Sequence, residues 1–111
     1  MKIAVASKDG ISINLHFGHA KVFMIYELRQ GQCYFLEKRK VENYCLGNSS
    51  NPTALEMILD TINDCELCFI AKIGEGPAEK LAKIGVKAVD SYAYEEIMEA
   101  LQEYAQILDS A

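Results

Sequence analysis

The sequence lacks any long hydrophobic run, and this argues against a membrane-spanning protein. Its longest strongly apolar stretch is residues 67–71, whereas a helix needs roughly 20 apolar residues to cross a bilayer. Lys8 and Asp9 interrupt the apolar beginning before it reaches the roughly 7–15 residues that a signal peptide requires. We therefore expect a cytoplasmic protein, in which the four cysteines are thiols and not a disulfide framework.

Positive charge is also scarce. Eleven lysines and arginines face sixteen aspartates and glutamates, which gives a net charge of -5. Nucleic-acid binding depends on neutralising phosphates, so a general DNA or RNA binder is not expected. Half of the residues are apolar and 24% are charged, as in ordinary globular proteins. The chain, residues 1–111, is therefore expected to form one domain with its own core.

Short strand patterns alternate with helical patterns along the chain. Period-two alternation predicts strands, and helical spacing behind capping signals predicts helices. Asn51 with Pro52 is expected to begin the first helix, and Ser91 to cap the last one, with Ala93 and Leu108 on its inner face. The expected strands are residues 2–6, 21–28, 33–41, 66–71 and 86–89, and the expected helices are residues 52–62, 78–84 and 92–108.

The order of these elements predicts how they assemble. Strand–helix–strand crossovers are nearly always right-handed and parallel. A five-stranded mixed sheet of order 3-2-1-4-5, with only strand 2 antiparallel and helices on both faces, satisfies this rule. Ligands of open α/β sheets bind at the carboxyl edge. Residues 7–20, 42–51 and 72–76 are expected to meet there.

Unusual chemistry is concentrated in these three segments. The first contains both histidines, His16 and His19, with Gly18 between them. Imidazole is the commonest metal ligand near neutral pH, and glycine lets a ligand approach the backbone closely. The second segment adds the thiol of Cys45, and the third carries Gly74 and Gly76 at a helix start that favours an anion. We therefore predict a ligand site with His16, His19 and Cys45 as metal ligands.

Each of these features also has a purely structural interpretation. Loop histidines often make only surface hydrogen bonds, and Cys45 could be a half-buried apolar residue. The segment from Gly74 to Pro77 could be a plain tight turn, because Glu79 stands where a dinucleotide fingerprint has its third glycine. Cys65 and Cys68 follow a helix and enter a strand, which is the wrong context for a redox pair. We expect their sulfurs to diverge, and we expect Cys33, Cys65 and Cys68 to be structural.

Several blocks of the sequence resemble the dinitrogenase iron–molybdenum cofactor biosynthesis family, which includes NifX, NifY and the carboxy-terminal domain of NifB. The His16-Phe17-Gly18-His19 block and the Tyr44-Cys45 loop look closest to the NifB tail domain. The similarity extends over nearly the whole chain. The matching blocks are residues 2–10, 16–20, 23–27, 44–45, 64–65 and 72–77.

The resemblance implies a ribonuclease H-like fold and a carrier, not an enzyme. Its cargo would be iron–molybdenum cofactor or an iron–sulfur precursor, and its partners other cofactor-assembly proteins. The histidine of the family's block maps to His16, and His19 and Cys45 are further candidate ligands. Phe17 and Gly18 of the same block are expected at the cofactor site. No Cys-x3-Cys-x2-Cys motif of radical chemistry occurs, so this chain is not expected to build the precursor itself.

Two other functions compete with the carrier. One is a zinc-binding or metal-free module for protein interaction or regulation. The other is a phosphate-ester hydrolase of the ribonuclease H-like kind, which needs clustered carboxylates for divalent metals. Asp9 is the only carboxylate in the first loop, which disfavours the hydrolase.

Overall fold

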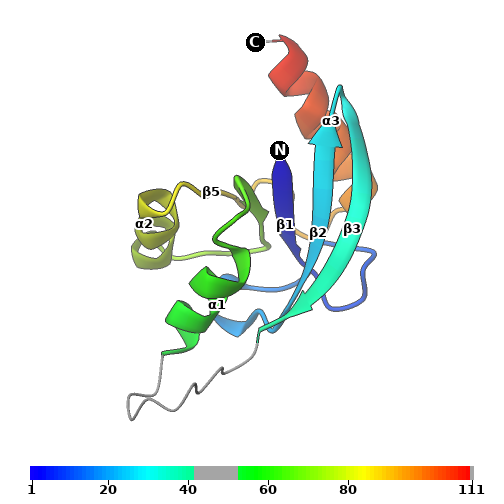
Figure 1. Cartoon of the computed structure of the whole chain (residues 1–111). Coiled ribbons are helices and arrows are strands. Elements are labelled where there is room, and N and C mark those ends of the chain that lie inside the picture. Colours follow the sequence, from blue (N-terminus) through cyan, green and yellow to red (C-terminus); the bar gives the residue numbers. More distant parts are fainter. Residues whose placement is uncertain (42–52, 111) are drawn as a thin grey trace.

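The structure is a computed structural model that describes residues 1–41 and 53–110 (Figure 1). Strands and helices alternate after an initial hairpin, as the sequence pattern predicts. The elements are β1 (Lys2–Ala6), the 3-10 turn η1 (Phe17–His19), β2 (Val22–Arg29), β3 (Gln32–Lys40), α1 (Ala54–Ile62), β4 (Leu67–Phe69), α2 (Glu75–Lys83), β5 (Lys87–Val89) and α3 (Ile97–Ser110). The strands lie within two residues of their predicted bounds.

The five strands form one sheet of order β3-β2-β1-β4-β5. β2 is antiparallel to both β1 and β3, whereas β4 is parallel to β1 and to β5. Only β2 therefore runs against the others, and the predicted order and directions are confirmed. The carboxyl ends of β1, β3, β4 and β5 consequently lie at one edge of the sheet.

A two-residue turn joins β2 to β3. Gln30 and Gly31 both have positive φ, of 54° and 77°, which is the conformation of the hairpin turn whose twist matches that of the strands. A register shift after Ile25 leaves Leu36 as an extra residue on β3. β3 is the edge strand, as its charged end at residues 37–40 predicts, and most of its residues are exposed.

Helices cover both faces of the sheet and divide the core in two (Figure 1). Residues from α1 and α2, such as Ile58 and Leu81, pack with Ala4, Phe23 and Ile25 on one face. On the other face, α3 packs against the residues that alternate with these in the strands. That second cluster contains Ile3, Val5, Met24, Phe69, Ile97, Ala100 and Leu101.

The first helix begins later than its predicted Asn51–Pro52 start. Its N-cap is Thr53, whose hydroxyl oxygen accepts a hydrogen bond from the backbone N–H of Glu56 at 3.1 Å. Asn51 and Pro52 lie outside the described residues. The sequence Thr53-Ala-Leu-Glu56 has the Ser/Thr-x-x-Glu pattern of a capping box, so a specific signal for this start was present.

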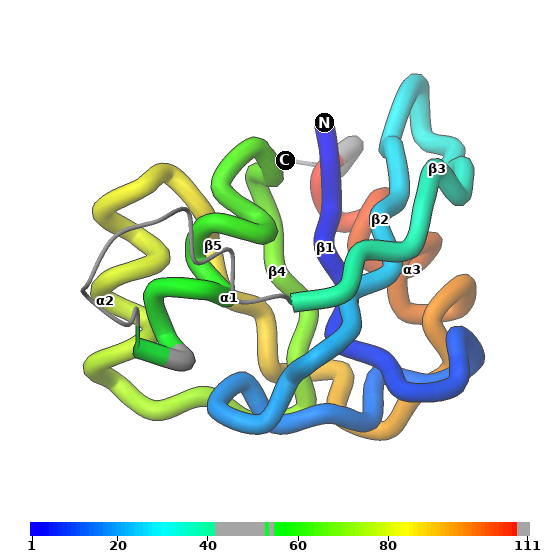
Figure 2. The backbone as a smooth tube through the Cα atoms, turned by 60° about the horizontal axis from the view of Figure 1, so that its bottom comes forward, coloured from blue at the N-terminus to red at the C-terminus, as the bar shows by residue number. Residues whose placement is uncertain are grey.

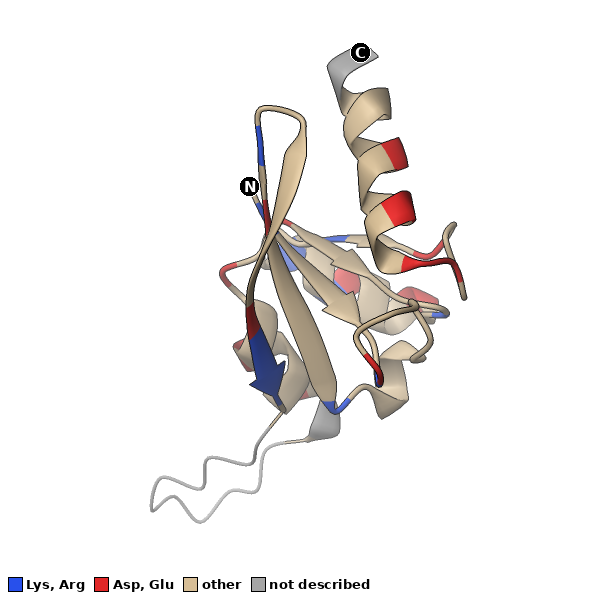
Figure 3. Ribbon diagram, turned by 90° about the vertical axis from the view of Figure 1, so that its right-hand side faces the viewer, with Lys and Arg blue, Asp and Glu red and all other residues tan. Residues whose placement is uncertain are grey.

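The other two helices also differ from their predicted bounds. The predicted turn at residues 74–77 is the first turn of α2, because Pro77 falls where a backbone N–H would have no intrahelical partner. α3 begins at Ile97, so Ser91 is not its cap and Ala93 precedes it. Leu108 is 39% exposed because the C-terminal half of α3 extends beyond the sheet (Figure 3).

Candidate functional site

The loop that leaves β1 is held by its own polar side chains. One carboxylate oxygen of Asp9 accepts hydrogen bonds from the backbone N–H groups of Ile11 and Ser12, at 2.8 and 3.1 Å, and from the buried Ser7 hydroxyl at 3.2 Å. These bonds, the backbone ones first, lower the pKa of Asp9. The Asp9 carboxylate therefore organises the loop, which further weakens its use as a metal ligand of a hydrolase.

The loop then runs beside the segment that follows β4, so two of the three predicted segments do meet (Figure 2). The backbone N–H of Ala71 donates to the carbonyl of Leu15 at 3.0 Å, and that of Phe17 donates to the carbonyl of Lys72 at 2.8 Å. Together they pair His16 with Lys72 in a parallel bridge. Residues 15–17 thus form a short backbone-paired strap at the carboxyl edge of the sheet.

The two neighbouring side chains of the His-Phe motif differ in burial: one lies in the core and the other at the surface. The Phe17 side chain is 1% exposed and belongs to the core between the sheet and α1 and α2. The neighbouring His16 side chain is exposed. Phe17, which the sequence predicts at the cofactor site, is therefore the anchor of the strap, and its ring cannot contact a surface ligand.

His19 and Gly18 lie on the single 3-10 turn that follows. The backbone N–H of His19 donates to the carbonyl of His16 at 3.0 Å, so the two histidines begin and end one tight turn. His19 is exposed, as is Gly18. A Cβ atom added to Gly18 would meet no other atom within 4 Å, so packing in the folded chain does not require glycine there.

A segment that the sequence interpretation omitted also reaches this edge. The backbone N–H of Tyr94 donates to the carbonyl of Ile13 at 2.8 Å, and that of Ile13 donates to the carbonyl of Glu95 at 3.0 Å. The Tyr94 hydroxyl lies 3.1 Å from Nε2 of His16. β5 runs parallel to β1, so its carboxyl end lies at the same edge of the sheet as His16. The predicted strand order could therefore have indicated that the residues after β5 reach this edge.

The start of α2 offers few donors to an anion. The first intrahelical hydrogen bond runs from Ala78 N–H to the Gly74 carbonyl at 3.1 Å, and Pro77 has no N–H. At most the amides of Glu75 and Gly76 are available, beside the carboxylate of Glu75 itself. Gly74 and Gly76 are exposed, and a Cβ on either would meet nothing closer than 3.6 Å.

The cysteines that the structure describes are at least partly buried, and they do not lie beside His16 and His19. Cys65 and Cys68 are 3% and 0% exposed and share one core cluster. The expectation that their sulfurs diverge is wrong, because Cys65 precedes β4 and does not alternate with Cys68 along it. Burial raises the pKa of Cys65 to about 12 and also raises that of Cys68, so both remain protonated thiols. Cys33 is partly buried at the start of β3, and Cys45 lies outside the described residues.

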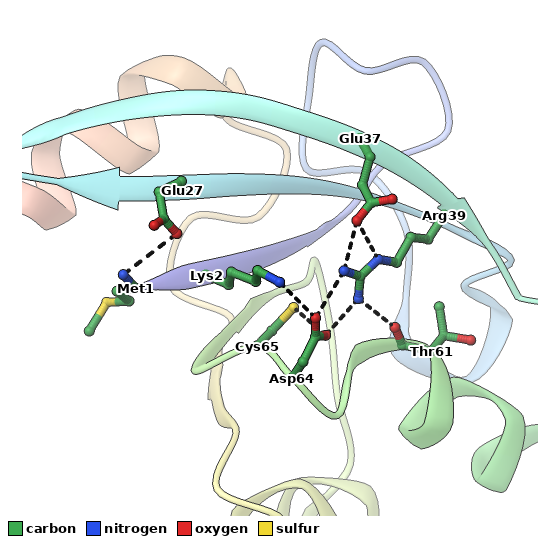
Figure 4. Close-up of polar contacts among 8 residues, drawn as sticks. All are labelled: Met1, Lys2, Glu27, Glu37, Arg39, Thr61, Asp64 and Cys65. Atoms are coloured by element: carbon green, nitrogen blue, oxygen red, sulfur yellow. Dashed lines mark hydrogen bonds and ion pairs between the residues drawn. The ribbon is translucent and has the colours of Figure 1, made fainter.

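A dense polar cluster joins Arg39, near the carboxyl end of β3, to Lys2 and Asp64, which lie where β1 and β4 begin (Figure 4). Arg39 contacts both carboxylate oxygens of Asp64, at 2.6 and 3.0 Å, and donates to the Thr61 carbonyl at 3.0 Å. Lys2 approaches the same carboxylate at 3.0 Å. These bonds, that of Arg39 first, hold the pKa of Asp64 well below its usual range. Glu37 completes the cluster by accepting from Arg39 at 2.8 and 3.1 Å.

Other surfaces of the described chain offer less chemistry. Basic residues gather at the end of β3, and acidic residues lie along α3 (Figure 3). A hollow of about 340 Å³ between α2 and β5 is lined by alanines, Gly85, Val86 and Lys87. Within residues 1–41 and 53–110, no three His, Cys, Asp or Glu side chains lie close enough to hold a metal together, and no helix could span a membrane.

Known proteins similar to this chain point to one family. Proteins named FeMo cofactor biosynthesis protein NifB are 40% identical over 92% of the chain in Herbaspirillum seropedicae, 44% over 86% in Bradyrhizobium diazoefficiens and 34% over 97% in Azotobacter vinelandii. The matched region is 19 to 22% of those proteins, so the chain spans about a fifth of their length.

A solved structure and a family description complete the comparison. The crystal structure of PH0822 superposes with a TM-score of 0.73 at 18% identity, over 96% of this chain and 91% of that one, and this likeness concerns the fold alone. The sequence model of the family described as dinitrogenase iron-molybdenum cofactor matches residues 1–107, almost the whole chain. The chain belongs to the dinitrogenase iron-molybdenum cofactor family.

Proposed function

We propose that this chain binds iron–molybdenum cofactor, or an iron–sulfur precursor of it, as cargo and passes it between cofactor-assembly proteins. The observation that carries the proposal is His16, an exposed imidazole on a strap that Phe17 anchors in the core. Membership of the family and the names of its relatives support this class of cargo. The proposal is a binding role without a chemical step, in the reducing cytoplasm.

Local chemistry has to attract this cargo. An iron–sulfur cofactor is anionic, and the chain has a net charge of -5, so the overall field repels it. At the site, the exposed Lys72 is paired through its backbone with His16 and brings a positive charge to the edge. Imidazole nitrogen suits iron as a ligand. Binding therefore depends on ligation by His16 with local support from Lys72 and the first amides of α2.

An incomplete ligand set suits a carrier. A closed four-ligand site holds a metal permanently, whereas a site with open positions exchanges what it binds. Within residues 1–41 and 53–110, His16 has no two further His, Cys, Asp or Glu side chains around it that would close such a site. His19 and Cys45 stay predicted as additional ligands. One to three ligands would hold the cargo and still release it to an acceptor.

Anaerobic titration of the protein with isolated iron–molybdenum cofactor tests the proposal. We expect a coloured complex of one cofactor per chain, isolated by gel filtration. His16→Ala is expected to weaken the affinity at least about tenfold, since even residues that only support a metal ligand are worth that much. His19→Ala changes the second predicted ligand on the same turn and is expected to weaken the affinity less than His16→Ala.

Two results would contradict the carrier. Absence of cofactor binding by the wild-type protein would refute it directly. Equal affinity in the wild type and in His16→Ala would show that the cofactor binds elsewhere. The competing zinc or protein-interaction module predicts instead stoichiometric zinc by metal analysis after purification, with no response to the cofactor.

A further inference from the structure

Tyr94, which is not among the proposed ligands, has a strained backbone although its side chain is largely exposed. Its φ of 66° lies in the left-handed region, where a bulky non-glycine residue is strained. Its side chain is 63% exposed, so burial of the ring does not account for the strain. Strained residues persist where the surrounding structure determines them, and they concentrate at functional sites.

Hydrogen bonds on both sides keep the Tyr94 backbone in this conformation. Its own N–H donates to the Ile13 carbonyl at 2.8 Å, and the next N–H, that of Glu95, donates to the Tyr92 carbonyl at 3.1 Å. Ile13 and Tyr92 are 0% and 7% exposed in the core under α3. The strained residue is therefore fixed to the core from two directions, while its ring stays at the surface.

The consequence of this conformation is a contact with the candidate ligand. The Tyr94 hydroxyl oxygen lies 3.1 Å from Nε2 of His16, a hydrogen-bond distance between residues 78 positions apart in the sequence. Metal-ligating histidines usually hydrogen-bond through the ring nitrogen that does not bind the metal, and this bond sets the tautomer and the ring orientation. Tyr94 occupies that supporting place for His16.

We infer that Tyr94 is a positioning residue for His16: its hydroxyl accepts the Nε2–H bond and leaves Nδ1 as the ligand atom for the cargo. The inference rests on the proposed carrier function. It assigns no metal contact to Tyr94 itself. It also gives a reason for the strained backbone, because a relaxed residue at position 94 would aim its side chain differently.

The test compares Tyr94→Phe with the wild type by two measurements. The first is the set of ring nitrogen chemical shifts of His16 in the ligand-free protein labelled with ¹⁵N-histidine, read by NMR at about pH 8. We expect Nε2 of His16 to shift in the variant while His19 does not. The second is the affinity for isolated iron–molybdenum cofactor, which is expected to fall about tenfold.

Two further variants separate positioning from folding. Tyr34→Phe removes the hydroxyl of another exposed tyrosine, which donates to Gln32 on the hairpin, and is expected to change neither measurement. Tyr94→Gly accepts the left-handed backbone without strain. It is expected to unfold at the same urea concentration as the wild type or a higher one, yet to bind the cofactor as weakly as Tyr94→Phe.

The outcomes distinguish this inference from the function on which it rests. Unchanged His16 nitrogen shifts in Tyr94→Phe would refute the contact, whatever the cofactor does. Equal or tighter cofactor binding by Tyr94→Phe would refute positioning, and tighter binding would show that Tyr94 competes with the cargo for Nε2. A wild-type protein that binds no cofactor, while the shifts still respond to Tyr94→Phe, would refute the proposed function and the cargo role of the contact.

Discussion

Adjacent residues of the histidine motif have opposite roles. Phe17 is 1% exposed and connects the strap to the core, whereas His16 is exposed and carries the candidate chemistry. A sequence motif that unites these residues therefore contains both a residue that stabilises the fold and a candidate ligand. Substitution of Phe17 would act on the fold, because large core aromatics cost about 3–5 kcal/mol when truncated to alanine. Only substitutions at exposed positions would test the proposed cargo binding without also changing the fold.

Gly18 offers such a position, and it yields a prediction at the residue scale. A Cβ there meets nothing within 4 Å, so Gly18→Ala is expected to change the free energy of unfolding by less than about 0.5 kcal/mol. If cargo approaches the turn between the histidines, the added methyl group is expected to weaken cofactor binding severalfold. Urea denaturation and cofactor titration of the same variant measure the two effects.

Gly85→Ala is the matched control for this prediction. Gly85 follows α2 with a φ of 83°, so alanine there would be strained by about 1–2 kcal/mol. It lies at the end of α2 away from Gly74, so cofactor affinity is expected to stay unchanged. A Gly18→Ala protein with full affinity would show that cargo does not approach this turn.

At the scale of elements, the cap of α1 shows how a local signal overrides a weaker one. Asn51 and Pro52 favour a helix start in isolation, but Thr53 and Glu56 supply the capping-box spacing, and the helix begins there. The hydroxyl oxygen of Thr53 satisfies the N–H of Glu56, one of the four amides that lack an intrahelical partner. The cap therefore sets the bounds of α1.

Thr53→Ala is expected to destabilise the protein by about 1 kcal/mol, because alanine cannot accept the hydrogen bond from Glu56 N–H. Thr53→Ser keeps the hydroxyl and is expected to stay within about 0.5 kcal/mol of the wild type. Urea denaturation of the three proteins compares them. Equal stability of the alanine and serine variants would contradict the role of this cap.

At the scale of the whole molecule, the Arg39–Asp64–Lys2 cluster joins parts that are far apart in sequence (Figure 4). Lys2 comes from β1, Arg39 from the edge strand β3, and Asp64 from the loop between α1 and β4. The cluster thus connects the hairpin to the start of the parallel half of the sheet. Lys2 and Asp64 lie where β1 and β4 begin, away from the strap that carries His16, so changes to Asp64 are expected to affect stability and not binding.

Asp64→Asn is expected to cost about 1–2 kcal/mol at pH 7, a modest value because the carboxylate is 39% exposed and partly screened by solvent. Its folded pKa is depressed, mainly by Arg39. Its contribution is therefore complete above the unfolded pKa near 4 and is lost as the pH falls through the folded value. The difference between wild type and variant should shrink below about pH 4.

Denaturation at pH 7, 4 and 3 measures this dependence. Asp90→Asn, at an exposed aspartate after β5, is the control and is expected to have a small effect at each pH. A stability difference for Asp64→Asn that stays constant down to pH 3 would contradict the assigned ion pair.

Much of the architecture follows from local patterns. Alternation of apolar residues predicts the strands, the short hairpin turn forces β2 against β3, and the handedness of crossovers leaves the order β3-β2-β1-β4-β5. The same rules place the His16 loop and the segment after β4 at one edge. These features were predictable because each depends on neighbours in sequence or on a general constraint of chain topology.

The sequence by itself determined the strand order, the two-sided core and the edge at which the histidines lie, since periodicity and chain connectivity suffice for these. Tertiary structure decided the partner of His16 and the environment of the cysteines. Tyr94 reaches His16 across 78 positions through a left-handed backbone that no residue pattern announces. Cys65 joins Cys68 in one core because β4 begins only after it. Such contacts depend on where separate elements end in space, which local preferences do not specify.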